Sequence, residues 1–193
     1  MYRPHKETQQ ERIDRLTQEA EKRVDQEGTA EPYTLERFRK TMFSKLRKVG
    51  VREFDDHHVQ LVNYIVDVYE VVQVLQLRAP NQETLDKLTL VLDKLQEYTV
   101  FHFGEEEIFF EKIEYPHRQT HIAQHKAFVA RFLEIRREIA AGRPQFVMDL
   151  FFAAFGWLFD HINQHDMKYS RYVQDNPKLL TSLRRSPPKP RPS

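Results

Sequence analysis

The chain has 193 residues and a formal net charge of +1, so its overall charge gives no indication of a polyanionic partner such as nucleic acid. It contains no cysteine, which excludes disulfides, iron–sulfur clusters and thiolate zinc sites. Histidine and carboxylate side chains therefore remain as the groups able to bind a transition metal. The N-terminus lacks the apolar core of a signal peptide, and the most apolar stretch, residues 146–159, is too short to span a bilayer. We therefore expect a cytoplasmic protein with no membrane span.

The small number of glycines and the spacing of apolar residues predict an all-α chain. Residues 1–49 form a charged N-terminal extension with two short predicted helices, one over 8–26 and one beginning after Thr34, a candidate N-cap. We expect this extension to pack on the main domain, although pairing between chains or contact with a protein partner would suit the same pattern. Residues 176–193 form a basic, proline-rich tail, which we predict to be disordered.

Four longer amphipathic helices are predicted within residues 50–175. The first two are separated by Ala79-Pro80-Asn81, whose asparagine is a candidate N-cap. Tyr115-Pro116 ends the second helix, and we expect the proline in the first turn of the third. Gly142 is expected just after the third helix, and Pro144 at the start of the fourth. Helices of this length joined by short turns predict an up-down-up-down four-helix bundle.

Each of these four helices carries histidine on its apolar side. His102 and Glu106 stand four residues apart, as do His121 and His125, and this spacing places both members of a pair on one helix face. Burying so many polar groups is costly unless they are paired or bind a metal. One histidine of this kind would be explained by ordinary core packing. The same pattern on four helices indicates a metal site inside the bundle.

Two positions are ambiguous on spacing alone. His57 and His58 are adjacent, and only His58 keeps phase with the apolar residues of its helix. On the fourth helix His165 is four residues from His161, whereas Asp166 is five residues away and about 140° around an ideal helix. Periodicity therefore prefers His165. Asp166 would need a wide site or a local π-type turn to reach the same point.

Four motifs carry the potential ligands: Asp56-His57-His58-Val59-Gln60-Leu61, His102-Phe103-x-x-Glu106-Glu107, His121-x-x-x-His125 and Trp157-Leu158-x-x-His161-Ile162-x-x-x-Asp166-x-x-Tyr169. As a set they resemble the hemerythrin family, in particular its bacterial members, over roughly residues 50–172. The resemblance implies two iron ions joined by an oxo or hydroxo group, and it favours Asp166 over His165. It implies seven metal ligands, which are His58, His102, Glu106, His121, His125, His161 and Asp166.

In the arrangement that the resemblance implies, one iron binds the three histidines of the third and fourth helices. The other binds His58 and His102, and the two carboxylates bridge both irons. If both irons are six-coordinate, one position is vacant, on the iron with two histidines. The resemblance then implies reversible O2 binding at that position rather than enzymatic turnover. Five side chains near the ligands would form an apolar O2 pocket: Leu61, Phe103, Trp157, Leu158 and Ile162.

Other functions fit parts of the pattern. A ferritin-like di-iron oxidase needs Glu-x-x-His on two helices, and this chain has that motif only at Glu114-x-x-His117, across a predicted turn. An enzyme with peroxidase or nitric-oxide chemistry would use the same ligands, as would an O2 or redox sensor that signals through the N-terminal helices. Imidazole also binds zinc. The chain departs from the family before the first ligand helix, where a usual tryptophan is absent and Lys48-Val49-Gly50-Val51 stands instead.

Overall fold

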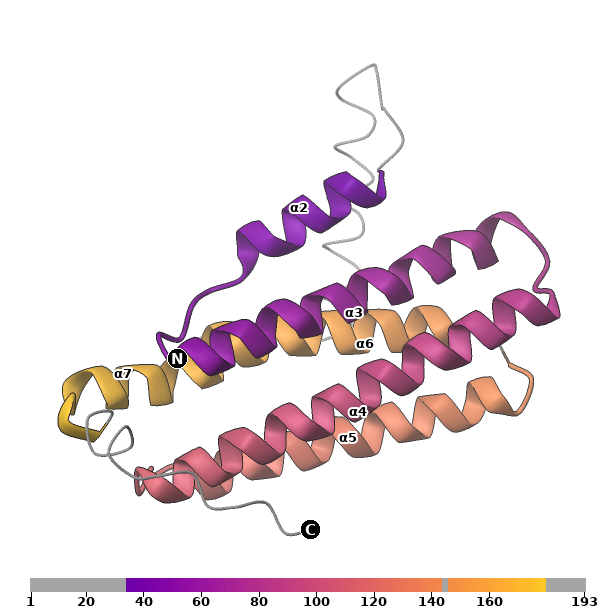
Figure 1. Ribbon diagram of the computed structural model, residues 1–193. Coiled ribbons are helices and arrows are strands. Elements are labelled where there is room, and N and C mark those ends of the chain that lie inside the picture. Colours follow the sequence, from indigo (N-terminus) through magenta and orange to yellow (C-terminus); the bar gives the residue numbers. More distant parts are fainter. Residues whose placement is uncertain (1–33, 144–145, 180–193) are drawn as a thin grey trace, which may run out of the picture.

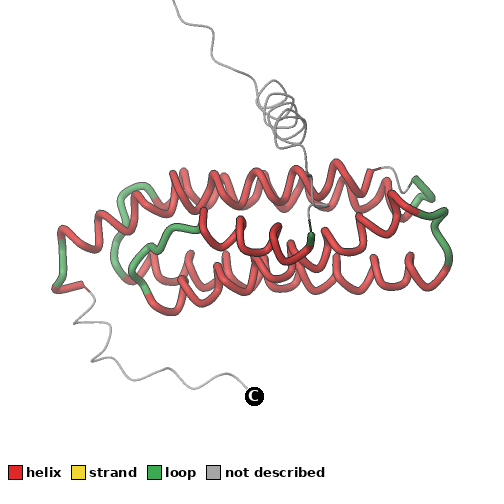
Figure 2. Tube along the Cα trace, turned by 90° about the horizontal axis from the view of Figure 1, so that it is seen from above, coloured by secondary structure: helices red, strands yellow, loops and turns green. Residues whose placement is uncertain are grey.

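The computed structural model describes residues 34–143 and 146–179, and all regular structure in these ranges is helical. The bundle consists of four long rods. They are α3 (Arg52–Leu77), α4 (Gln82–Lys112), α5 (Arg118–Ala140) and a fourth rod made of α6 (Phe146–Asp160), η1 (His161–Asp166) and α7 (Met167–Asp175). Both α3 and α5 pack on α4 and on α6, so the rods form a closed ring. Successive rods run in alternating directions (Figure 1), and Figure 2 shows the bundle from above. The predicted up-down-up-down bundle is confirmed.

Local capping chemistry sets the helix boundaries. Asn81 caps α4 as predicted, because its Oδ1 accepts a hydrogen bond from the Thr84 amide at 2.8 Å. The end of α5 is a Schellman motif, in which Gly142 has φ +81° and the Arg143 amide donates to the Glu138 carbonyl at 3.2 Å. A left-handed backbone is easily adopted by glycine, so the sequence located this helix end correctly.

The end of α4 makes the same pattern of hydrogen bonds without a glycine. Glu114 has φ +52°, and the Tyr115 amide donates to the Phe110 carbonyl at 2.9 Å. The left-handed backbone costs about 1–2 kcal/mol at a non-glycine residue, so the hydrogen bonds and packing of this turn must offset it. The predicted place of Pro116 is wrong: α5 begins at Arg118, and the proline lies in the preceding turn. Proline suits turns as well as first helical turns, so its position alone did not define the helix start.

The described part of the N-terminal extension contains α2 (Leu35–Lys45), which packs on α3 as Figure 1 shows. Its predicted cap is confirmed, because Thr34 Oγ1 accepts a hydrogen bond from the Arg37 amide at 3.2 Å. The Phe38 ring of α2 stacks on the Tyr69 ring of α3, with 4.0 Å between ring centroids. An apolar and aromatic contact therefore attaches this helix to the bundle.

Several predicted features lie outside the described residues: the helix over 8–26, the helix start at Pro144 and the tail after residue 179. Within the described residues, none of the helices combines the length and apolarity that crossing a membrane requires. The core of the bundle is built from apolar side chains along all four rods. Buried histidines and carboxylates form a belt across it, at the end where α3 and α5 begin and α4 stops.

Candidate metal centre

The seven predicted ligands meet inside the bundle, and none is more than 4 % exposed. They come from all four rods: α3 provides His58, α4 provides His102 and Glu106, α5 provides His121 and His125, and η1 provides His161 and Asp166. The rods alternate in direction, so the beginnings of α3 and α5 lie beside the end of α4 and the η1 turn. This antiparallel arrangement brings together side chains that are far apart in the sequence.

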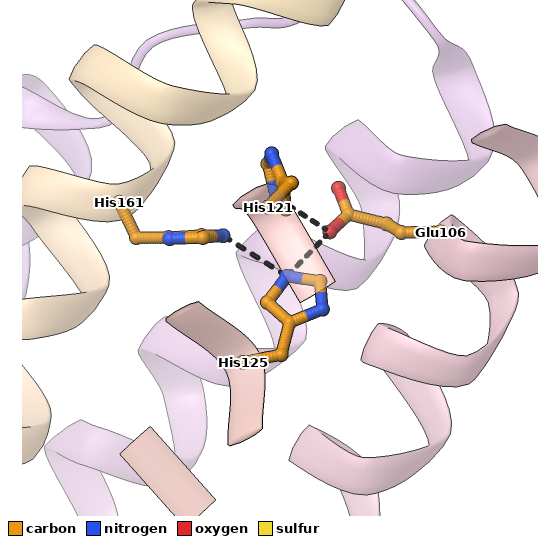
Figure 3. Close-up of side chains that lie close together, drawn as sticks. All are labelled: Glu106, His121, His125 and His161. Carbon is orange, nitrogen blue, oxygen red and sulfur yellow. Dashed lines mark hydrogen bonds and ion pairs between the residues drawn. The ribbon is translucent and has the colours of Figure 1, made fainter. Parts of the chain in front are cut away.

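The potential ligand atoms form two clusters that share Glu106. The larger joins Glu106 to the three histidines of α5 and η1, and Figure 3 shows these four side chains pointing toward one another. The smaller joins Glu106 to His58 and His102. Within each cluster the ligand atoms lie within 4.8 Å of one another. One carboxylate oxygen faces both clusters, since Glu106 Oε2 lies 3.3 Å from His125 Nε2 and 3.8 Å from His102 Nε2.

Asp166 also faces both clusters. Its Oδ2 lies 3.3 Å from His58 Nε2, and its Oδ1 lies 3.2 Å from His121 Nε2 and 3.1 Å from His161 Nε2. One oxygen is therefore directed toward each cluster. A carboxylate in this position has the geometry needed to bridge two metal ions.

The π-helical turn η1 explains how Asp166 reaches the site. In a regular α-helix Asp166 would lie about 140° from His161, whereas a π turn adds a residue and brings i and i+5 close to one face. His165 is half-buried in the same turn, and its Nδ1 accepts a hydrogen bond from Gln124 Nε2 at 3.0 Å. When Nδ1 accepts this bond, Nε2 carries the proton of the neutral ring, so neither nitrogen offers a lone pair to a metal, and His165 belongs to neither cluster. The structure thus places Asp166, and not His165, among the other candidate ligands.

His57 is buried like its neighbour but faces a different environment. Its ring packs against the rings of Phe101 and Tyr98, at centroid distances of 5.0 Å and 5.8 Å, and edge-on against the back of the site at His102, at 5.6 Å. Of the two adjacent histidines, His58 makes the close contact with Asp166. The structure therefore separates the two adjacent histidines, as the helical phase of the sequence predicted.

Burial keeps most of the imidazoles neutral. Desolvation lowers the pKa of His125 to about 4, and it lowers the pKa of His161 and, more strongly, that of His102. Neutral imidazole is the form that binds a metal ion, so these rings need not lose a proton first. His58 differs. Desolvation lowers its pKa, but the Asp166 carboxylate, 3.3 Å from its Nε2, outweighs this effect and raises it.

The two carboxylates experience opposite shifts. Desolvation, followed by the charge of nearby Asp166, raises the pKa of Glu106 to about 8. Desolvation also opposes the ionisation of Asp166, but the surrounding imidazoles, with His161 first, hold its pKa well below the usual range. Without a cation, the site therefore cannot easily carry two ionised carboxylates. A bound metal ion would supply the missing positive charge.

Unpaired polar atoms test whether a metal fits the site. Five buried atoms at the centre of the clusters have no hydrogen-bond partner among the described residues: His58 Nε2, His121 Nε2, Glu106 Oε2, Asp166 Oδ1 and Asp166 Oδ2. Each buried, unsatisfied polar atom costs about 1–3 kcal/mol. Each of the five lies within 3.8 Å of another atom of the set, so cations bound among them would satisfy all five. Imidazole and carboxylate without thiolate suit iron, zinc and similar divalent metals.

Two further residues hold the candidate ligands in place. The buried Tyr169 hydroxyl donates a 2.8 Å hydrogen bond to Glu106 Oε1, and Glu107 Oε1 accepts one from His125 Nδ1 at 3.2 Å. Such bonds fix the orientation of a metal ligand. Sequence reasoning assigned neither role. The available signals were that Glu107 adjoins a predicted ligand, and that Tyr169 follows Asp166 by three residues.

Aromatic rings cover the larger cluster. Phe103 stacks on His125 with 3.8 Å between centroids, and Trp157 stacks on His161 at 4.2 Å. The other predicted pocket residues, Leu61, Leu158 and Ile162, are buried in the core. Two of the five pocket residues thus lie against histidines of the larger cluster. The vacant coordination position for O2 was instead expected at the smaller cluster, which contains His58 and His102.

A cavity of about 250 Å³ lies beside the larger cluster, and the sequence did not predict it. Its wall includes His121 from the metal centre. The remaining wall consists of Tyr115, His117, Thr120, Gln124, His165 and Lys168. The apolar side chains predicted to form the O2 pocket do not line this cavity.

The fold and site define a class of protein: a helical bundle that encloses histidine and carboxylate ligands for a metal. The sequence model of a family described as "Hemerythrin HHE cation binding domain" matches residues 49–173. The chain therefore belongs to the hemerythrin family, whose domain binds cations.

Three relatives are named bacteriohemerythrin. The protein of Clostridium acetobutylicum is 25 % identical over 126 residues, which are 63 % of this chain and 92 % of that relative. The protein of Stenotrophomonas maltophilia is 29 % identical over 65 % of this chain and 76 % of its own length. The protein of Pseudomonas aeruginosa is 28 % identical over 62 % of this chain and 72 % of its own length.

Proposed function

We propose that this protein binds O2 reversibly at a pair of iron ions inside the bundle. The observation that carries this proposal is the pair of clusters. They share Glu106, and each has one oxygen of Asp166 close to a histidine. Two ferrous ions held there would supply the electrons and the open coordination position that O2 binding needs. The names of the bacteriohemerythrin relatives support this proposal.

The proposed ligand assignment follows the two clusters. The ion in the larger cluster is held by three imidazoles, and the ion in the smaller cluster by His58 and His102. Glu106 and Asp166 would bridge the pair. The smaller cluster has one imidazole fewer, so an ion held there by His58 and His102 would have the position open to O2.

The protein around the centre favours binding over turnover. Leu61 and Ile162 are fully buried beside the ligand-bearing turns, and in our proposal they belong to a pocket that excludes water. The Tyr169 hydroxyl is committed to Glu106, and burial raises its pKa well above the ordinary value. It is therefore a poor proton donor, whereas turnover of a bound oxygen species requires proton delivery. Location in the cytoplasm and pairing through the N-terminal helices stay predictions.

The direct test is anaerobic loading with two ferrous ions per chain, followed by exposure to O2. We expect a visible charge-transfer band that disappears when O2 is removed and returns over several cycles. The zinc-loaded protein is the control: it uses the same ligands, but it cannot supply electrons and should stay colourless. A band that persists after O2 is removed, or steady consumption of peroxide, would instead assign the centre to a sensor or an enzyme.

A further inference from the structure

The side chain of Asn163 connects the π turn to a distant part of the chain. Asn163 lies in η1 between His161 and Asp166. Its Nδ2 donates a hydrogen bond to the Lys45 carbonyl, and its Oδ1 accepts one from the Arg47 amide, both at 3.2 Å. A single amide side chain thus pairs with two backbone groups of the segment that joins α2 to α3. We call residues 45–50, the last residue of α2 and the five that follow it, the connector.

The connector is bonded to two rods of the bundle. On one side the Ser170 hydroxyl of α7 donates a buried 2.6 Å hydrogen bond to the Val49 carbonyl. On the other side the Asp55 carboxylate of α3 accepts hydrogen bonds from the Val49 and Gly50 amides at 2.7 Å and 3.2 Å. With Asn163 included, the connector joins the first turn of α3 to both η1 and α7.

The connector joins the same two elements, α3 and η1, that face each other at the metal centre. His58 follows Asp55 by one helical turn, and its ring lies 3.3 Å from Asp166 at the end of η1. The connector therefore links the two elements whose ligands face each other. The family match begins at residue 49, so Lys45 and Arg47 belong to the added N-terminal part of this chain.

We propose that Asn163 is a positioning residue for the metal centre. It touches none of the proposed ligands and acts through the turn that carries two of them. By pairing with the connector, it holds η1 in the widened conformation that brings Asp166 beside His58. A π turn is rarer than an α turn and needs such support to persist. The inference rests on the ligand assignment of the proposed function, but it does not require that the centre bind O2.

Metal affinity gives the first test, with Zn²⁺ as the probe in competition with a chelator. Asn163→Ala is expected to bind Zn²⁺ about tenfold more weakly, the lower end of the loss when support for a metal ligand is removed. The Co²⁺-loaded variant should show a changed visible spectrum, because Asp166 no longer keeps its place. Gln164→Ala is the matched control: Gln164 is exposed in the same turn, and within residues 34–143 and 146–179 its side chain bonds to its own rod, to Asp160 Oδ1 at 3.2 Å. It should behave as wild type.

Amide hydrogen exchange gives the second test. Because coupling between two sites is reciprocal, Zn²⁺ should slow exchange at the Val49 and Gly50 amides, which bond to Asp55 and not to Asn163. This slowing should persist in Gln164→Ala and largely vanish in Asn163→Ala. If Asn163→Ala does not fold, Asn163→Ser serves in its place, since its shorter side chain cannot pair with both the Lys45 carbonyl and the Arg47 amide, and the same losses are expected.

Some outcomes would overturn the inference. Unchanged Zn²⁺ affinity and an unchanged Co²⁺ spectrum in Asn163→Ala, even with a lower melting temperature, would reduce Asn163 to a packing residue. Failure of Zn²⁺ to slow exchange at Val49 in the wild type would also overturn the inference. A wild-type protein that shows both Zn²⁺ effects but no reversible O2 band would refute the proposed function and leave this inference standing.

Discussion

Glu106→Gln is expected to abolish tight binding of the metal pair and, at the same time, to stabilise the metal-free protein. Both clusters share Glu106 Oε2, so the loss of its charge affects both metal positions. Glutamine has nearly the same shape, and its amide oxygen can still accept the Tyr169 hydrogen bond. The substitution therefore removes mainly the negative charge. A bound metal needs this charge, whereas the metal-free site is destabilised by it.

The pKa shift of Glu106 gives the sign and size of the stability gain. In the unfolded chain this carboxyl loses its proton near pH 4.5, whereas in the folded, metal-free protein its pKa is about 8. The folded state thus holds an extra proton between these values, and the wild type loses stability as pH rises through that window. At about 1.4 kcal/mol per pKa unit, removing this penalty stabilises Glu106→Gln by about 3 kcal/mol at pH 7.

Chemical denaturation of the metal-free proteins at pH 5 and pH 7.5 measures this gain, and metal analysis after dialysis measures the loss of binding. The advantage of Glu106→Gln should be larger at pH 7.5. Glu105→Gln is the control, since it changes an adjacent carboxylate that belongs to neither cluster. A variant that retained both metals, or that was less stable than wild type at pH 7.5, would contradict the assigned role of Glu106.

His102→Ala is expected to reduce the metal content from about two ions per chain to about one. The smaller cluster contains only two histidines, so this change leaves His58 as its single imidazole. The three imidazoles of the larger cluster are untouched and should keep their ion. Because O2 is proposed to bind at the smaller cluster, the reversible band should disappear even when the remaining iron is ferrous.

Iron and protein assays after gel filtration measure this change, and circular dichroism checks that the helices persist. His57→Ala is the matched control, because it removes the same atoms from a buried histidine that packs on Phe101 and Tyr98. It should retain about two ions per chain. Normal metal content and a normal spectrum in His102→Ala would show that the ligand assignment is wrong.

The described helices of this protein could largely be predicted from its sequence, because their signals are local. Asn81 and Thr34 cap helices through bonds to amides three residues away, and Gly142 ends one through its own backbone freedom. Pairs such as His121 and His125 share a face by helical geometry alone. Where several residue types suit the same local structure, as at Pro116, the prediction failed.

The candidate site depended on more than local signals. The periodicity of this chain preferred His165, and only the resemblance to a known family favoured Asp166. The structure places Asp166 at the centre through the π turn, and Asn163 in that turn bonds to a segment 116 residues earlier in the chain. The bond from Tyr169 to Glu106 spans 63 residues in the same way.

The sequence by itself therefore determined the helices, their buried faces and the types of ligand that those faces carry. Tertiary structure alone decided which oxygen faces which histidine, how one carboxylate serves two clusters, and where the connector meets η1. The physical reason is range. Capping and periodicity depend on neighbours within about one helical turn, whereas the geometry of the metal centre depends on how four separate rods pack together.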